Sequence, residues 1–257
     1  MTASVDYVDK ITKLLNKAQG TDVEAEAEAF RDKAYELMAQ FRIDEAEIEA
    51  RRRAAGGSRK DEKIVEKDIP LTGVFRYGLR DLSFFVIDAM PDVSAYFIDN
   101  ARTEVKLANG KTRWAESVIF IVVGYESDVD QAILLLTSLH LQAATALVPW
   151  WNGESWHRTL GRGEAFRSKR SFIRSFGAGA GQKIRLATVK ARVGMTSGAE
   201  LVLRDKSVAV QDYLAKYQMK HAKNRNQNGP TGSKDGYDAG QRADTGEKKV
   251  GNRRMIE

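Results

Sequence analysis

The six-residue run Val118–Val123 (VIFIVV) constrains the fold of this chain more than any other feature. It is continuously apolar and rich in β-branched residues, a pattern typical of a strand that is buried on both faces. We therefore expect a small sheet packed by helices, to which residues 116–123 contribute a buried strand. The same run is the longest apolar stretch of the chain, and it is far shorter than the roughly 20 residues that a membrane span needs.

Three other segments have the composition of strands. Ile64–Leu71 is expected to form a short edge strand, and Val93–Ile98 a second strand. Asn109 and Gly110 form a turn signal between Val93–Ile98 and the buried strand. A last strand is expected at Glu200–Arg204.

Apolar residues at helical spacing predict four helices in the same part of the chain, over residues 74–90, 127–147, 163–192 and 207–217. Pro91 ends the first of these helices. Ser127 and Asp130 are expected to cap the second, and the segment from Pro149 to Gly153 is expected to break it. Gly177–Gly181 either interrupts the third helix or marks a place where another element packs closely.

The first 53 residues predict a helical hairpin. A helix over about residues 6–18 ends at Gly20, and Thr21 with Glu24 has the spacing of a capping box that opens the second helix. One apolar stripe of that second helix consists of Phe30, Ala34, Leu37 and Phe41. A short third helix is expected to end near Arg53.

The predicted fold class is therefore α+β, with a small β-sheet packed by long helices. Residues 1–53 form the hairpin, and the polar, glycine-containing segment 54–63 is a linker. Residues 64–217 form the α+β domain. Residues 218–257 are expected to be a disordered basic tail, because they contain almost no apolar side chain.

Charge is distributed unevenly along the chain, whose net charge is +6. The segment Arg158–Arg192 contains ten Lys or Arg residues and a single acid, Glu164, and the last forty residues are also basic. Residues 1–157 are net acidic. Such asymmetry indicates either a polyanionic partner or the docking of one half of the chain on the other.

No motif of catalysis or metal binding is present. The chain has no cysteine, its three histidines lack metal-ligand spacing, and the sequence patterns of zinc proteases, serine hydrolases and nucleotide-binding loops are absent. We expect no catalytic residue, no metal and no cofactor, although a site assembled from scattered residues remains an alternative. His140 lies near an apolar helix stripe and is expected to be a hydrogen-bonded core histidine.

The glycines at positions 177, 179 and 181 resemble a phosphate-binding loop only in composition. A phosphate loop follows a strand and opens a helix, whereas the preceding segment SKRSFIRSF has a helical pattern. Close approach of another element is the better interpretation of these small residues.

The basic segment 163–192 predicts an amphipathic helix with an arginine face. The candidate nucleic-acid-binding residues are Arg162, Arg167, Arg170, Arg174, Arg185, Arg192, Trp150 and Trp151. Arginine suits phosphate because its planar fork can donate two parallel hydrogen bonds, and the tryptophans could stack on exposed bases. The alternatives are that the arginines pair with the acidic N-terminal half or bind another acidic partner, and that the tryptophans cap the core.

Residues 6–217 resemble a family of uncharacterised bacterial and bacteriophage proteins. The features that carry the resemblance are KITKLLNKAQGTDVEAEAEAFRDKAYELMAQFRID near the N-terminus, SFIRSFGAGAGQKIRL, and AELVLRDKSVAVQDYLAKY. The resemblance implies a domain of unknown function with an accompanying C-terminal module, and a phage or bacterial origin. It implies no activity and no catalytic residue.

These observations lead to two hypotheses about function. The first is a cytoplasmic, non-enzymatic accessory protein that binds DNA or RNA through the basic helix and the basic tail. The second is an interaction module that binds a host or phage protein through the acidic hairpin. No membrane partner is expected, and the sequence does not predict the oligomeric state.

Overall fold

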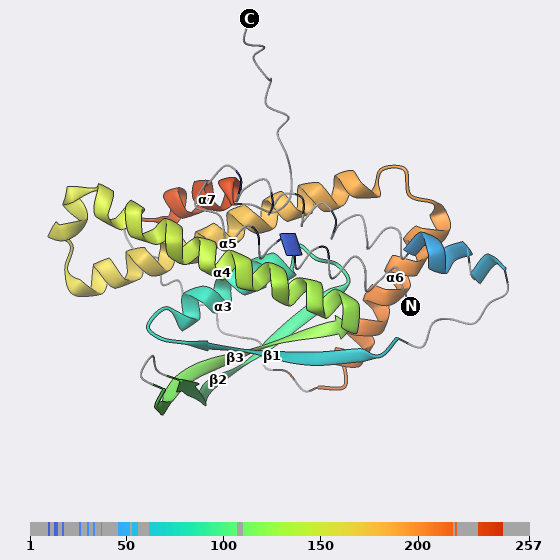
Figure 1. Cartoon of the computed structure of the whole chain (residues 1–257), viewed down its shortest axis with the longest axis horizontal. Helices are drawn as coiled ribbons and strands as arrows, with labels where there is room; N and C mark the ends of the chain where they lie inside the picture. The colour runs from blue at the N-terminus through green and yellow to red at the C-terminus, as the bar shows by residue number, and fades with distance from the viewer. Residues whose placement is uncertain are drawn as a thin grey trace, which may run out of the picture.

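The computed structural model describes residues 46–51, 53–55, 62–106, 110–217, 219 and 231–243, together with single helical positions at 10, 13, 14, 17, 26, 30, 33 and 37. It is an α+β protein with a small antiparallel sheet and long helices (Figure 1). In chain order the elements are β1 (Ile64–Thr72), α3 (Arg76–Ile87), β2 (Val93–Lys106), β3 (Thr112–Tyr125), α4 (Glu126–Gly153), the 3-10 helix η1 (Ser155–Thr159), α5 (Arg162–Arg192), α6 (Ser197–Leu214) and α7 (Ser233–Arg242).

The sheet has the strand order β1-β3-β2, so the strand that contains Val118–Val123 lies in the middle. Both neighbours pair with it in antiparallel fashion. The prediction of an edge strand at the start of the domain and of a fully buried strand near residue 120 is confirmed. β2 and β3 are each longer than expected, and a register shift between Ile98 and Ala101 marks a bulge in their pairing.

The two faces of β3 face different parts of the molecule, because alternate side chains of a strand point in opposite directions. Val118, Phe120 and Val122 belong to the main core that α3, α4 and α5 share. Ile121 and Val123, together with Tyr125, pack instead against Val210 of α6 at one end of the opposite face. Coverage of both faces explains why the run has no polar residue.

Helix α4 lies along the sheet, and the sequence prediction of its end was wrong. Pro149 lies inside the helix, which continues to Gly153. Packing of Trp150 on Phe172, with ring centroids 4.6 Å apart, stabilises the turn that follows the proline. By length and composition α4 could cross a membrane, but a core helix meets the same criterion, and one face of α4 lies in the main core.

Helix α5 is a single helix that the glycines do not break, and α3 packs closely along it. A Cβ atom built on Gly177 would lie 2.4 Å from the Leu82 Cα, and one built on Gly181 would lie 2.4 Å from the Phe85 carbonyl oxygen. Only glycine permits such contact between two helix backbones. The close-packing interpretation of these glycines is therefore confirmed.

The expectation that the whole C-terminal tail is disordered is wrong for residues 231–243, which include helix α7. Gly232, Gly236 and Gly240 recur every four residues and so lie along one face. Cβ atoms on them would lie 2.6, 2.2 and 2.0 Å from the carbonyl oxygens of Ser168, Phe172 and Phe176 of α5. The helix gains its contact area from backbone approach rather than from apolar side chains, which is why composition did not predict it.

The expected strand at Glu200–Arg204 is instead part of helix α6, which also includes most of the predicted helix 207–217. The Thr196 hydroxyl accepts a hydrogen bond from the Ala199 backbone N–H and caps the helix. Ala199, Val202 and Leu203 lie on one face and pack with Ala46. This helical face outweighs the β propensity of the short run LVL.

The predicted hairpin lies largely outside the described residues. Leu14 and Leu37, which are among its described positions, are partly buried and pack against the main core. Residues 46–51 are helical, as predicted for the short third helix. Residues 53 and 54 are also helical and residue 55 is a turn, so the helix ends close to the predicted Arg53. Most of the predicted linker, residues 56–61, and most of the tail also lie outside the described part of the chain.

Candidate nucleic-acid interface

Three of the candidate arginines contact α3 or the residue that follows it, although Arg185 remains exposed to solvent. Arg170 forms an ion pair with Asp81 at 3.3 Å, and its side chain is 15% exposed. Arg185 pairs with Asp88, and the Arg174 guanidinium lies 5.8 Å from the centre of the Phe85 ring. These partners recur along α3 because α3 and α5 run side by side in the same direction. The predicted arginine face is thus partly used within the molecule, by acids of the N-terminal half.

The remaining candidate arginines are exposed but do not lie together. Arg162 and Arg167 are in the first turns of α5, next to Arg158 of η1. Arg192 ends the same helix, about 45 Å away at 1.5 Å per residue. Only the arginines at the start of α5 can therefore belong to one contact surface.

Trp150 and Trp151 are both packed against other rings. Trp150 stacks on Phe172, as described above, and Trp151 stacks on His157 with ring centroids 4.5 Å apart and planes 1° from parallel. The Lys169 ammonium lies 4.1 Å from the Trp151 ring centre. His157 is buried, and its Nδ1 is 3.1 Å from the Trp151 carbonyl oxygen. This arrangement matches the alternative in which these tryptophans cap the core.

A basic β-ribbon that the sequence analysis missed lies at the same end of the molecule. The last pair between β1 and β3 is Thr72 with Ser117, so beyond it β2 and β3 pair only with each other. This two-stranded ribbon comprises Ala101–Lys106 and Thr112–Glu116. Its exposed cations and its exposed aromatic residue are Arg102, Lys106, Arg113 and Trp114, and exposed Lys111 lies at its tip.

The sequence contains one signal for the ribbon, the Asn109-Gly110 turn. The predicted strands stopped short of that turn. A ribbon whose two faces are exposed to solvent has little alternation of apolar and polar residues from which a strand could be predicted. The predicted ends at Ile98 and Glu116 coincide with the place where the strands leave the core.

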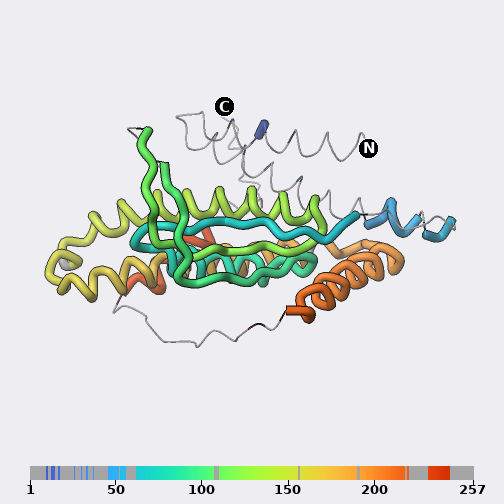
Figure 2. Tube along the Cα trace, turned by 90° about the horizontal axis from the view of Figure 1, so that it is seen from below, coloured from blue at the N-terminus to red at the C-terminus, as the bar shows by residue number. Residues whose placement is uncertain are grey.

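Two contacts connect the base of the ribbon to the start of α5. The Arg76 guanidinium donates to the Glu116 carboxylate at 2.6 Å, which joins α3 to β3. Phe75 stacks on Phe166 of α5, with ring centroids 5.6 Å apart. Figures 1 and 2 show the ribbon in the same half of the molecule as the α4–α5 connection, and in Figure 2 the ribbon projects out of the body across the long axis.

We refer to this region as the basic end. It consists of the cations of the ribbon and those of the α4–α5 connection: Arg102, Lys106, Lys111, Arg113, Arg158, Arg162 and Arg167. Within the described part of the chain, Arg102, Lys106, Arg113, Arg158, Arg162 and Arg167 form no ion pair. Their charge is consequently available to an external anion.

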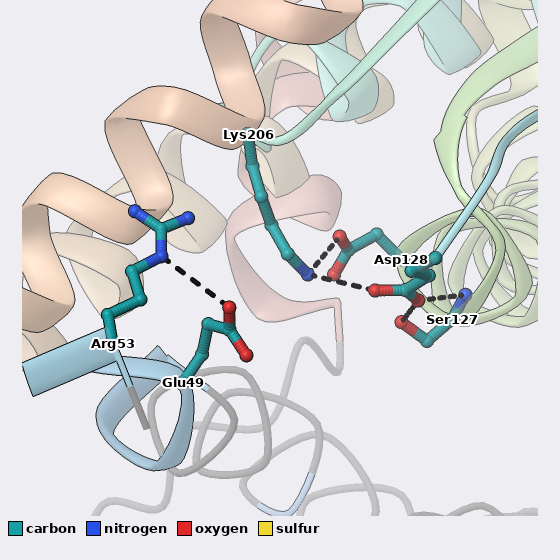
Figure 3. A network of polar contacts seen from close by, with 6 residues as sticks. Glu49, Arg53, Ser127, Asp128 and Lys206 are labelled. Atoms are coloured by element: carbon teal, nitrogen blue, oxygen red, sulfur yellow. Dashed lines mark hydrogen bonds and ion pairs between the residues drawn. The ribbon is translucent and has the colours of Figure 1, made fainter. Parts of the chain in front are cut away.

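The opposite end also contains charged residues, and some of its cations are paired with acids (Figure 3). Lys206 of α6 lies 3.2 Å from Asp128 and 3.6 Å from Glu62, and it is 13% exposed. Glu62 also accepts a hydrogen bond from the Ser127 hydroxyl at 2.7 Å. Nearby, Arg53 is held 2.8 Å from Asp205. This network fixes α6 against the start of α4 and has the features of a structural contact.

His140 has a hydrogen-bonded ring, as predicted, but it is half-buried rather than fully enclosed in the core. Its Nε2 lies 2.8 Å from the Ser83 hydroxyl, and burial lowers its pKa to about 4. The ring is therefore neutral at pH 7. Among the residues that the structure describes, no group of three or more histidine or acidic side chains could hold a metal ion.

In the comparison with known proteins, one segment of the chain is similar to a family model. Residues 6–45 match the family described as "Protein of unknown function (DUF2786)". The matched segment lies within the predicted hairpin, residues 1–53, and it includes Leu14 and Leu37. No curated protein and no solved structure matches the chain.

Proposed function

We propose that this protein is a non-enzymatic nucleic-acid-binding protein whose contact surface is the basic end. The observation that supports the proposal best is the position of the ribbon, which carries exposed cations beyond the core in the same half of the molecule as the exposed arginines at the start of α5. Six of these cations, namely Arg102, Lys106, Arg113, Arg158, Arg162 and Arg167, form no ion pair with any described residue, and such a set suits a polyanion of regularly spaced phosphates.

The proposed surface differs from the one that the sequence alone predicted. Arg162 and Arg167 remain in it, Arg170 and Arg185 are held by acids of α3, and the ribbon replaces them. Part of the proposed basic tail forms α7, whose role is to pack on α5. DNA and RNA both meet the chemical requirement, and a phage or bacterial accessory role in the cytoplasm remains part of the proposal.

The alternative function, binding of a host or phage protein through the N-terminal hairpin, has less support. Leu14 and Leu37 pack on the main core, so these two side chains of the hairpin are engaged inside the molecule. A partner that bound these apolar side chains would first have to displace them from the core. A nucleic-acid partner requires no such displacement, because the basic end is already exposed.

The proposal is tested by removing two positive charges from the basic end and, in a second variant, two from the other end of the molecule. The affinities of the two variants for nucleic acid are then compared. The double variant Arg162→Gln/Arg167→Gln should weaken binding of a labelled duplex and of a labelled single strand. The salt dependence should also flatten, by about 0.9 per lost phosphate contact on duplex DNA and about 0.7 on a single strand.

The matched control is Arg192→Gln/Arg204→Gln, which removes two exposed arginines far from the basic end. This control should bind as the parent protein does. Equal weakening by the two double variants, or the absence of salt-dependent binding by the parent, would refute the proposed function.

A further inference from the structure

Trp114 is an exposed tryptophan at a position where no fold requirement explains it. Its residue is 66% exposed on the two-stranded part of the β2–β3 ribbon. No other described ring or cation lies against its indole. Exposure of a large aromatic ring to water is costly, and tryptophan of this kind is enriched where a partner covers it.

The pairing register shows which side chains share a face with Trp114. Residues directly opposite each other in an antiparallel pair project to the same side of the sheet. Glu104 pairs with Trp114, Lys106 with Thr112 and Arg102 with Glu116. Arg102 and Lys106 are thus the diagonal neighbours of Trp114 on its own face, about 7–8 Å away.

We propose that Trp114 is a base-stacking platform and that the ligand of the basic end is single-stranded nucleic acid. This inference rests on the proposed function and specifies the ligand class. An indole flanked by two cations matches a ligand that alternates phosphates with flat rings. In a duplex the base faces are stacked on one another, whereas a single strand leaves them free for a protein ring.

The ribbon also explains how a strand could be bound without sequence preference. It has only two strands and carries exposed side chains on both faces, such as Trp114 on one and Arg113 on the other. A strand would therefore bind to an open surface and not in a closed pocket. Stacking on an aromatic ring tolerates any base, because every base has a π-face. Arg113, on the opposite face of the ribbon, and the arginines at the start of α5 would hold the flanking phosphates.

The test uses the full-length protein and a labelled thymidine oligonucleotide, with a duplex of the same length as the second probe. Trp114→Ala should weaken single-strand binding by about five- to one-hundred-fold, since stacking of one base contributes that much. Trp114→Phe should weaken single-strand binding less than Trp114→Ala does, because phenylalanine keeps an aromatic face. Val189→Ser, which changes an exposed apolar residue of α5 outside the basic end, should leave binding unchanged.

A second variant distinguishes this face of the ribbon from the rest of the basic end. Glu104→Gln removes the acid opposite Trp114 and should tighten single-strand binding several-fold, because it removes repulsion of phosphates. Binding of the strand should also quench the fluorescence of the parent protein more than that of Trp114→Phe.

The outcomes separate the two proposals. If both probes bind with salt dependence but Trp114→Ala binds the single strand as tightly as the parent does, the stacking inference is wrong and the proposed function stands. Tighter binding of the duplex than of the single strand, or an unchanged affinity in Glu104→Gln, would also overturn the inference. If neither probe binds the parent, the proposed function itself has failed.

Discussion

His140 is the side chain whose ionisation the core opposes most clearly. Burial lowers its pKa to about 4, whereas the unfolded chain has a histidine pKa of about 6.5. Between these values the unfolded state binds a proton that the folded state does not, so the free energy of unfolding falls as the pH falls. The stabilisation is complete above about pH 6.5 and is lost towards pH 4.

We predict that His140→Gln removes this pH dependence. Glutamine can still form a hydrogen bond with Ser83, but it does not titrate. Relative to the variant, the parent protein should lose about 3 kcal/mol of unfolding free energy between pH 7 and pH 4, because lowering a pKa by one corresponds to about 1.4 kcal/mol. Urea unfolding of both proteins at several pH values measures this loss. Parallel pH profiles would contradict the assignment of a buried neutral imidazole.

At the scale of elements, α7 is the clearest case of a helix that composition conceals. Its sequence SKDGYDAGQR predicts disorder, and deletion of such a tail is expected to leave stability unchanged. The structure predicts the opposite, because α7 packs on α5 through its glycines and because the Lys183 ammonium donates to the Ala243 carbonyl at 2.7 Å.

Gly240→Ala tests whether α7 is docked in solution. The added methyl would lie 2.0 Å from the Phe176 carbonyl oxygen, and a helix backbone cannot move away without separating the two helices. We expect a loss of about 1–3 kcal/mol in unfolding free energy, as for other overpacked sites. Thermal and urea unfolding measure it.

The control for Gly240→Ala is Gly153→Ala, at the end of α4. A Cβ atom there meets nothing within 4 Å, so the change should be neutral or stabilise by up to about 1 kcal/mol. Equal stability of Gly240→Ala and the parent would show that α7 does not depend on this contact.

Elements with a strong apolar pattern were the ones that the sequence predicted correctly. Val118–Val123, the edge strand β1 and helix α3 all pack apolar side chains into one core, so their periodicity is visible in the sequence. The ribbon and α7 were missed because backbone pairing and glycine contacts leave little trace in side-chain hydrophobicity. The end of α4 and the helical state of residues 200–204 depend on tertiary packing, which overrides local propensity.

The candidate site was predicted in part. The sequence identified an excess of arginine in α5 and the close packing at its glycines, but it could not show that Arg170 and Arg185 face Asp81 and Asp88. Those pairs join residues about ninety positions apart in the chain, so they depend on how α3 packs on α5. The choice between an arginine face and internal pairing required the fold.

At the scale of the whole molecule, the proposed function depends on the clustering of exposed cations at the basic end. At the end that contains α6, Lys206 pairs with Asp128 and Arg53 with Asp205, whereas Arg192 and Arg204 are exposed. At the basic end, Arg102, Lys106, Arg113, Arg158, Arg162 and Arg167 are exposed and form no ion pair within the described residues. An anionic ligand should therefore approach the ribbon and the start of α5 first.

The most direct test of this account is to map where nucleic acid touches the protein. The full-length chain is cross-linked by ultraviolet light to a single-stranded oligonucleotide at low salt, and the modified peptides are identified by mass spectrometry. We predict cross-links within residues 101–116 and 155–167, and their loss as salt is raised, because the contacts are to phosphates. Cross-links confined to α6 and the end of α5 near Arg192 would contradict the account.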